Sequence, residues 1–267
     1  MKVAFWNSIS QADDVINYMA AIGVILAQEY NCEVVLGSNY ISNYMLQDCF
    51  FGKMKEDGIA HAPYRYTYGS SEYCRKLWSM KRNRQGNILE IPMEGLKIVY
   101  PPDITEMQMF YYNIPQTGFY FLAAAEDNKA IFQAVLEEAD YLVVILSQNV
   151  AEIQKFFQRF SSFIPQTIFV IEEVQKSKRN GSRFSYREIL EKHGIKGETV
   201  IGVSKSKEHK EACEEGKLET FLRKIKATKD PQYRFWAGIK RVAKAIYECN
   251  VQENRGEVEL YKKIQEN

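Results

Sequence analysis

Short apolar runs alternate along the chain with longer segments whose apolar residues recur at helical spacing. The runs have the length of buried strands, and the intervening segments have the length of helices that connect parallel strands. The predicted strands are residues 2–6, 33–37, 96–100, 117–125, 141–146, 167–171 and 199–203. The predicted helices are residues 19–30, 45–51, 127–138, 150–163, 185–193, 207–216, 218–226 and 233–248. This alternation predicts an α/β fold, a doubly wound and mostly parallel sheet with helices on both faces, in three layers.

The last predicted helix is amphipathic and basic. Its apolar face carries Phe235, Ile239, Val242, Ala243 and Ile246, and its other side carries Arg234, Lys240, Arg241 and Lys244. Helices that pack on a sheet and helices that lie in a membrane interface share this pattern. Because polar sequence follows it, we expect this helix to pack on the sheet and to bury Trp236 and Ile239.

The stretch from Tyr64 to Arg84 places several tyrosines among arginines and lysines. Aromatic and basic residues together can stack on bases and hold phosphates. However, 35 basic residues against 34 acidic ones leave a formal charge of only +1, so nothing attracts the whole protein to a polyanion. We interpret the stretch as a solvated helix face at one edge of the sheet and find no strong signal for nucleic-acid binding.

The composition fits a single domain. A chain of 267 residues, 46% of them hydrophobic, can bury one substantial core, and no repeat or low-complexity linker divides it. We predict one α/β domain over residues 1–250, followed by a polar C-terminal tail or helix over residues 251–267.

Cysteine and histidine usage indicates a cytoplasmic protein without a metal. The five cysteines are an odd set without a C-x-x-C pair, the N-terminus has no signal-like segment, and no run of about 18 apolar residues could form a transmembrane segment. The three histidines, His61, His193 and His209, have no partner at metal-ligand spacing. We therefore expect reduced thiols, surface histidines and no bound metal.

The segment between the first strand and the first helix has unusual chemistry. In phosphate-binding proteins this segment supplies glycines, whose backbone N–H groups close on the phosphates, and a lysine that neutralises them. Residues 7–14 contain neither glycine nor lysine and offer Asp13 and Asp14 instead. Both aspartates suit the N-terminus of a helix, so we expect them to cap it.

The order of three segments resembles the ParA/MinD family of P-loop ATPases. They are Lys2-Val-Ala-Phe-Trp6 with Met19-Ala-Ala-Ile22, the run Leu136-Glu-Glu-Ala-Asp140-Tyr-Leu-Val-Val144, and Ser147-Gln148-Asn149. The resemblance extends over residues 2–250 and implies the P-loop NTPase fold, a Rossmann-like arrangement. Within the family the chain is similar to the divergent TadZ-like branch, which accompanies the assembly of Tad pili.

The resemblance also shows which family motifs are lost. The signature lysine of the family would fall at Asn7, its second lysine at Ala12, and its magnesium-binding hydroxyls at Asp13 and Asp14. The degenerate phosphate-loop positions are Asn7, Ser8, Ser10, Gln11, Ala12, Asp13 and Asp14. The aspartate expected after the second strand is absent from Leu36-Gly37-Ser38-Asn39, and Ala123-Ala124-Ala125, followed by Glu126 and Asp127, stands where the family has an Asp-Thr pair.

A retained fold with degenerate motifs implies a pseudo-ATPase, with no catalytic residue, metal or nucleotide cofactor. Its expected role is that of an interaction or positioning protein for a pilus or secretion-type assembly. We expect a homodimer in the cytoplasm that reaches the inner face of the membrane through protein partners. The alternative is a protein that binds ATP or ADP with magnesium, or hydrolyses ATP slowly, through an atypical phosphate loop. An unrelated transferase on the same fold is a third possibility, since fold does not determine function.

Overall fold

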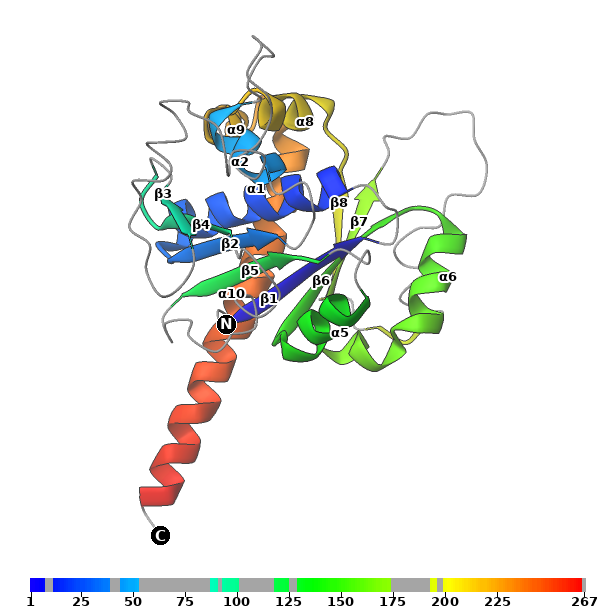
Figure 1. Ribbon diagram of the computed structural model, residues 1–267, viewed down its shortest axis with the longest axis vertical. Coiled ribbons are helices and arrows are strands. Elements are labelled where there is room, and N and C mark those ends of the chain that lie inside the picture. The colour runs from blue at the N-terminus through cyan, green and yellow to red at the C-terminus, as the bar shows by residue number, and fades with distance from the viewer. Residues whose placement is uncertain are drawn as a thin grey trace, which may run out of the picture.

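In the part of the chain that the structure describes, eight strands form one sheet, and helices cover both of its faces (Figure 1). The computed structural model describes residues 1–7, 12–38, 44–52, 87–90, 93–100, 118–124, 129–173, 193–195 and 199–265. The strands are β1 (Lys2–Asn7), β2 (Val34–Ser38), β3 (Asn87–Glu90), β4 (Leu96–Tyr100), β5 (Phe119–Ala123), β6 (Tyr141–Ser147), β7 (Thr167–Glu173) and β8 (Val200–Ser204). Their order is β3-β4-β2-β5-β1-β6-β7-β8, and all neighbours are parallel except β3 and β4. The predicted doubly wound, mostly parallel sheet is confirmed.

The central strand β1 separates two hydrophobic cores. It pairs with β5 on one side and β6 on the other, so both edges of its backbone are hydrogen-bonded. Successive side chains of a strand point to opposite faces, and here Val3 and Phe5 join one core while Ala4 and Trp6 join the other. Tyr141–Leu146, predicted to be a central buried strand, lies in β6, next to β1.

The helices divide between the two cores. The first core is covered by α1 (Ala12–Tyr30), α2 (Tyr44–Phe51), α8 (Lys207–Glu214), α9 (Leu218–Ile225) and α10 (Tyr233–Gln265). The second is covered by α5 (Lys129–Glu138) and α6 (Val150–Arg159), followed by the 3-10 helix η2 (Ser161–Gln166). The arrangement therefore has the three layers that the sequence predicts.

Several element boundaries differ from the prediction. The helix α1 begins at Ala12 rather than Met19, because Val15 and Ile16 also lie buried against the first core. The helix α6 ends at Arg159 rather than residue 163, and Pro165 lies inside η2 instead of ending α6. The antiparallel strand β3 was not predicted, since four residues are too few to show an alternating pattern. The predicted helix 185–193 (apart from residue 193) and the stretch 64–84 fall outside the described residues.

The basic helix α10 packs on the sheet as expected. Ile239 is fully buried and Trp236 is 8% exposed, as predicted for a helix that packs on the core. The helix continues past the body of the domain to Gln265 (Figure 1). The division of the chain at residue 250 stays a prediction. Among the described residues, no helix is both long and apolar enough to cross a membrane.

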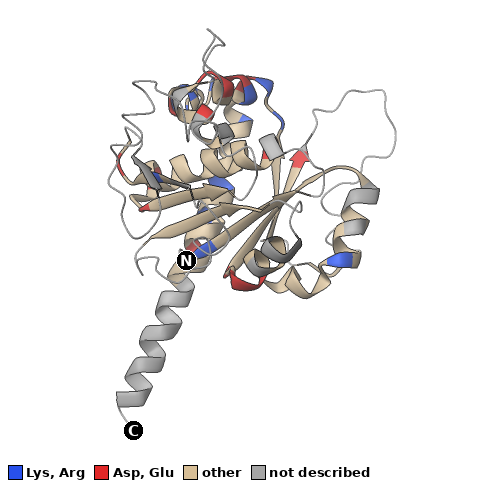
Figure 2. Cartoon of the chain, viewed as in Figure 1, with Lys and Arg blue, Asp and Glu red and all other residues tan. Residues whose placement is uncertain are grey.

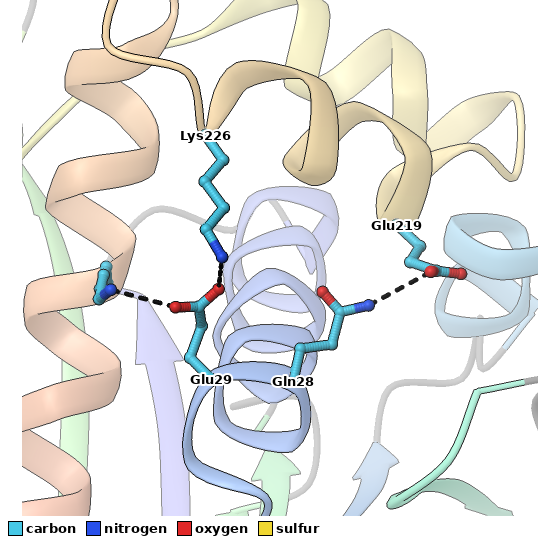
Figure 3. Close-up of polar contacts among 5 residues, drawn as sticks. Gln28, Glu29, Glu219 and Lys226 are labelled. Carbon is cyan, nitrogen blue, oxygen red and sulfur yellow. Dashed lines mark hydrogen bonds and ion pairs between the residues drawn. The ribbon is translucent and has the colours of Figure 1, made fainter.

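A charged contact joins three helices at the C-terminal end of α1. The carboxylate of Glu29 accepts hydrogen bonds from Lys226, just after α9, and from Lys240 of α10, the latter at 3.1 Å (Figure 3). Beside it, Gln28 donates to Glu219 of α9 at 3.2 Å. Burial raises the pKa of Glu29, but the hydrogen bonds and charges of the two lysines outweigh burial and lower this pKa below its ordinary value of 4.5.

We predict that Glu29→Gln lowers the free energy of unfolding by about 1 kcal/mol at pH 7, because two lysines lose their charged acceptor. The folded-state pKa of Glu29 is depressed, so its stabilisation is present above pH 4.5 and is lost as the pH falls through the lower folded value. Urea unfolding at pH 7 and pH 4 measures both effects. Glu248→Gln is the matched control, because Glu248 forms an exposed pair with Lys244 within α10 and should contribute much less. Equal losses for the two variants would contradict the prediction.

Candidate functional site

The carboxyl edge of the sheet is the natural place for a site in this fold. Ligands of open α/β sheets bind beyond the carboxyl ends of parallel strands, where the following helices begin. At this edge β1 ends at Asn7 and β6 ends at Ser147, and α1 begins at Ala12. Figure 2 shows that the sheet itself carries few charged residues. The charged groups that reach this edge therefore define its chemistry.

Three side chains from distant segments form a polar cluster at this edge. The hydroxyl of Tyr18, on α1, donates to Oε1 of Glu172, on β7, at 2.9 Å. The other oxygen, Oε2, accepts from Nζ of Lys205 at 3.2 Å. The Glu172 side chain is 10% exposed and that of Lys205 is 54% exposed, so the ion pair connects a buried carboxylate with the solvent.

The charge of Asp14 acts on the same cluster. Burial raises the pKa of Tyr18 well above 10, and the charges of Glu172 and Asp14 raise it further. Burial lowers the pKa of Lys205, but Glu172 first and Asp14 second outweigh this and raise it overall. The ammonium group of Lys205 is thus paired with Glu172 and influenced by the charge of Asp14, near the point where α1 begins.

The sequence-predicted positions lie around this cluster. Asn7 is the last residue of β1, whereas Ser8, Ser10 and Gln11 lie outside the described residues. Ala12, Asp13 and Asp14 are the first three residues of α1, so the aspartates lie within its first turn and do not precede it as caps. They still lie at the positive end of the helix dipole, where carboxylates are stabilising.

Tyr18, Glu172 and Lys205 were not predicted as site residues. The available signal was Glu172 itself, a carboxylate that directly follows the apolar run 167–171. In the family's Asp-Thr position, Ala123 and Ala124 are fully buried, and Glu126 and Asp127 lie outside the described residues.

His209 corrects the expectation that the histidines lie on the surface. It is 4% exposed, and its ring centroid lies 4.4 Å from that of Phe235. The ring is buried because Tyr18 of α1 and Phe235 of α10 pack against it, while its backbone N–H donates to Ser206, the N-cap of α8. Burial lowers the pKa of His209 to about 3, against a weaker opposing effect from a hydrogen bond to the backbone of Asn17.

The other two histidines add no metal chemistry. His193 is partly buried and stacks on Phe157 with ring centroids 3.7 Å apart, and His61 lies outside the described residues. In the described part of the chain, no three histidine, cysteine or acidic side chains gather as a metal site would require.

Solved structures that match this fold include proteins of the MinD and ParA type. The MinC:MinD cell division protein complex of Aquifex aeolicus matches with a TM-score of 0.64 at 13% identity, over 92% of this chain and 95% of that one. MinD of Pyrococcus horikoshii complexed with Mg-ADP matches with a TM-score of 0.59 at 8% identity, over 92% and 95% of the two chains. A ParA family ATPase of Chlorobium tepidum matches with a TM-score of 0.55 at 14% identity, over 91% and 98%. At these identities the likeness establishes the fold.

Sequence comparisons add no closer relative. No protein-family model matches the chain, and no curated protein sequence matches it significantly. The site must therefore be interpreted from its own residues.

We predict unequal roles for the three clustered side chains. Tyr18→Phe should cost about 1 kcal/mol of unfolding free energy for its lost hydrogen bond, and Glu172→Ala about 2 kcal/mol, because it leaves the buried Tyr18 hydroxyl without its acceptor. Lys205→Ala should cost less than Glu172→Ala, since its side chain is half exposed. Urea unfolding measures all three, with Glu172→Gln as the control that keeps an acceptor. A Lys205→Ala loss as large as that of Glu172→Ala would refute this ranking.

We also predict that His209 makes stability depend on pH. Its folded pKa of about 3 lies below the ordinary 6.5, so the unfolded chain takes up a proton that the folded protein excludes. Stability should therefore fall as the pH drops below 6.5, by about 1 kcal/mol per pH unit. The free energy of unfolding, measured between pH 7 and pH 5, tests this prediction, because most carboxyl groups titrate below that range. His209→Asn should flatten the slope, and His193→Asn, which retains His209, should keep it.

Proposed function

We propose that this protein is a non-catalytic member of the ParA/MinD group, a pseudo-ATPase that acts through protein interactions. The observation that carries the proposal is the charge at the start of α1. Asp13 and Asp14 occupy the first turn of this helix, and the sequence contains no lysine or arginine between Val3 and Gly52. A triphosphate at this helix N-terminus would meet two carboxylates and no cation from the loop.

The rest of the carboxyl edge supports the same conclusion. In the described part of the carboxyl edge, the basic side chain is that of Lys205. It forms an ion pair with Glu172, and the charge of Asp14 also acts on it. Phosphoryl transfer depends on cations that neutralise the developing charge. In the described part of this edge, the ammonium of Lys205 is paired with Glu172 and influenced by Asp14, so it is poorly placed to drive hydrolysis.

The proposed role in protein interactions follows from a fold whose described residues lack the groups for hydrolysis. A stable α/β fold without its chemistry presents surfaces rather than a reaction centre, and one solved structure with this fold, MinD of Aquifex aeolicus, is complexed with a partner protein, MinC. Because the chain resembles the TadZ-like branch, we propose that it positions a pilus or secretion-type assembly. It would do so in the cytoplasm, at the inner face of the membrane. Its partners would be a second copy of itself and proteins of that assembly.

Nucleotide binding through an atypical loop is the second candidate. The observation in its favour is that a protein with this fold, MinD of Pyrococcus horikoshii, was solved with Mg-ADP. In this chain such binding would have to use backbone groups of residues 8–11 and would have to overcome Asp13 and Asp14.

We predict no ATP hydrolysis above buffer and no stabilisation by ATP or ADP with magnesium. A ligand present at a hundred times its dissociation constant would add about 2.7 kcal/mol of stability, so a thermal-shift titration detects even modest binding. Phosphate release measures turnover. The matched variant Asp13→Ala should also be inactive, because removing a carboxylate supplies no lysine. Turnover in the natural protein that Asp13→Ala abolishes would favour the second candidate.

We predict a homodimer in the absence of nucleotide. Without triphosphates, two copies could pair across the carboxyl edge with no added phosphate charge to repel them. Sedimentation equilibrium over micromolar concentrations should give the mass of two chains, unchanged by added ATP. A monomer at the highest concentration would remove this part of the proposal and would leave the nucleotide prediction standing.

A further inference from the structure

A second polar cluster lies among the helices and adjoins the Glu172 cluster, since the ring centroids of Tyr18 and His209 are 5.9 Å apart. Asn17 of α1, Cys49 of α2, and His209 and Cys213 of α8 are 8%, 0%, 4% and 2% exposed. The thiol of Cys49 donates to Oδ1 of Asn17 at 3.4 Å, and Sγ of Cys213 lies 3.6 Å from Nε2 of His209. The His209 ring also hydrogen-bonds to the backbone of Asn17, and Cys49 lies close enough to Cys213 to raise the pKa of its thiol. The four groups therefore form one buried cluster where α1, α2 and α8 meet.

The fold alone brings these two thiols together. Cys49 lies on the helix that follows β2 and Cys213 on the helix that follows β8, the last strand of the sheet order. The helices α2 and α8 pack against each other beside α1. An unfolded chain would hold the two sulfurs far apart, so a reaction between them reports the native contact.

The chemistry of these side chains argues against a metal site and against a reactive thiolate. Two sulfurs and one imidazole could suggest a soft metal, but no three such groups gather as metal ligands in the described residues. Burial raises the pKa of the Cys213 thiol, and proximity to Cys49 raises it further, so neither an exposed nucleophile nor a stable thiolate is present. The reaction left to two adjacent buried thiols is with each other.

We propose that Cys49 and Cys213 are a modification site, at which a small-molecule disulfide such as oxidised glutathione forms an intramolecular disulfide that joins α2 to α8. The thiolate of one cysteine attacks oxidised glutathione, forms a mixed disulfide and releases one glutathione. The second cysteine then attacks the protein sulfur of that mixed disulfide and releases the other glutathione. Both thiol protons end on the two glutathione molecules, which are the reduced product.

The first attack requires a transient opening of the contact between α2 and α8, because both sulfurs are buried. The product would fix α8 directly after Lys205 and Ser206, next to the Glu172 cluster. Under oxidising conditions the disulfide would therefore restrain α8, which begins beside the carboxyl edge of the sheet. This site stands independently of the proposed function, since no nucleotide or partner enters the chemistry.

The test uses the full chain with Cys32, Cys74 and Cys249 replaced by serine, so that only the proposed pair can react. Folded protein is incubated with oxidised glutathione, remaining thiols are blocked with N-ethylmaleimide in denaturant, and peptides are mapped by mass spectrometry. The expected product is a peptide pair that links residues 49 and 213 in one chain and that dithiothreitol reverses. The same oxidation in urea should give mainly mixed disulfides with glutathione.

Single variants separate pairing from general oxidation. Cys213→Ser should lose the cross-link, and Cys49→Ser should do the same, while circular dichroism confirms that both remain folded. The oxidised pair should also raise the thermal midpoint by several degrees, reversibly, because a cross-link restricts the unfolded chain. Recovery of both thiols unmodified, or only intermolecular and mixed disulfides from folded protein, would overturn the proposal.

Discussion

The burial of α1 is the constraint on which one face of this protein depends. From Val15 to Ala27 nearly every side chain of α1 belongs to the first core, against the sheet and against α2, α8, α9 and α10. A helix surrounded in this way can carry polar groups only at its ends. At its N-terminal end Asp14, Asn17 and Tyr18 meet β7 and α8, and at its C-terminal end Gln28 and Glu29 meet α9 and α10. The apolar middle of α1 provides stability, and its two polar ends determine how the neighbouring helices are placed.

The same separation explains why the fold can persist while the chemistry varies. The two cores are built from apolar residues such as Phe5 and Trp6, which contribute no charge to the carboxyl edge. The groups that set the charge of that edge, Asp14, Glu172 and Lys205, contribute a few contacts among many. Structures at 8–14% identity share this fold over more than nine-tenths of the chain, as expected if packing and site are specified by different residues.

Local patterns predicted the fold well because they reflect burial on one segment at a time. The continuous run of β6 and the apolar stripe of α10 required nothing beyond their own spacing. The start of α1 was misplaced because Asp13 and Asp14 have the composition of a cap, although the buried Val15 and Ile16 extend the helix to them. Contacts between side chains of distant segments could not be predicted from local sequence. Tyr18 and Glu172 are 154 residues apart, and nothing in either segment indicates the other. His209 looked like a surface residue because its neighbours in the sequence are charged, while Phe235, which covers it, lies on a different helix.

The start of α1 connects stability with the proposed loss of nucleotide binding. The N-terminus of a helix presents unpaired N–H groups and about half a positive charge, which an ATPase of this fold would use for phosphate. Asp13 and Asp14 use the same positive end for the protein's own carboxylates, each with a stabilisation of about 0.3–1 kcal/mol. Lys205 then offsets part of the charge of Asp14 from across the edge. A phosphate bound at this helix end would therefore compete with the protein's own carboxylates for the same positive charge. Selection on such a chain can therefore act on its surfaces, and the site residues can change without loss of the fold.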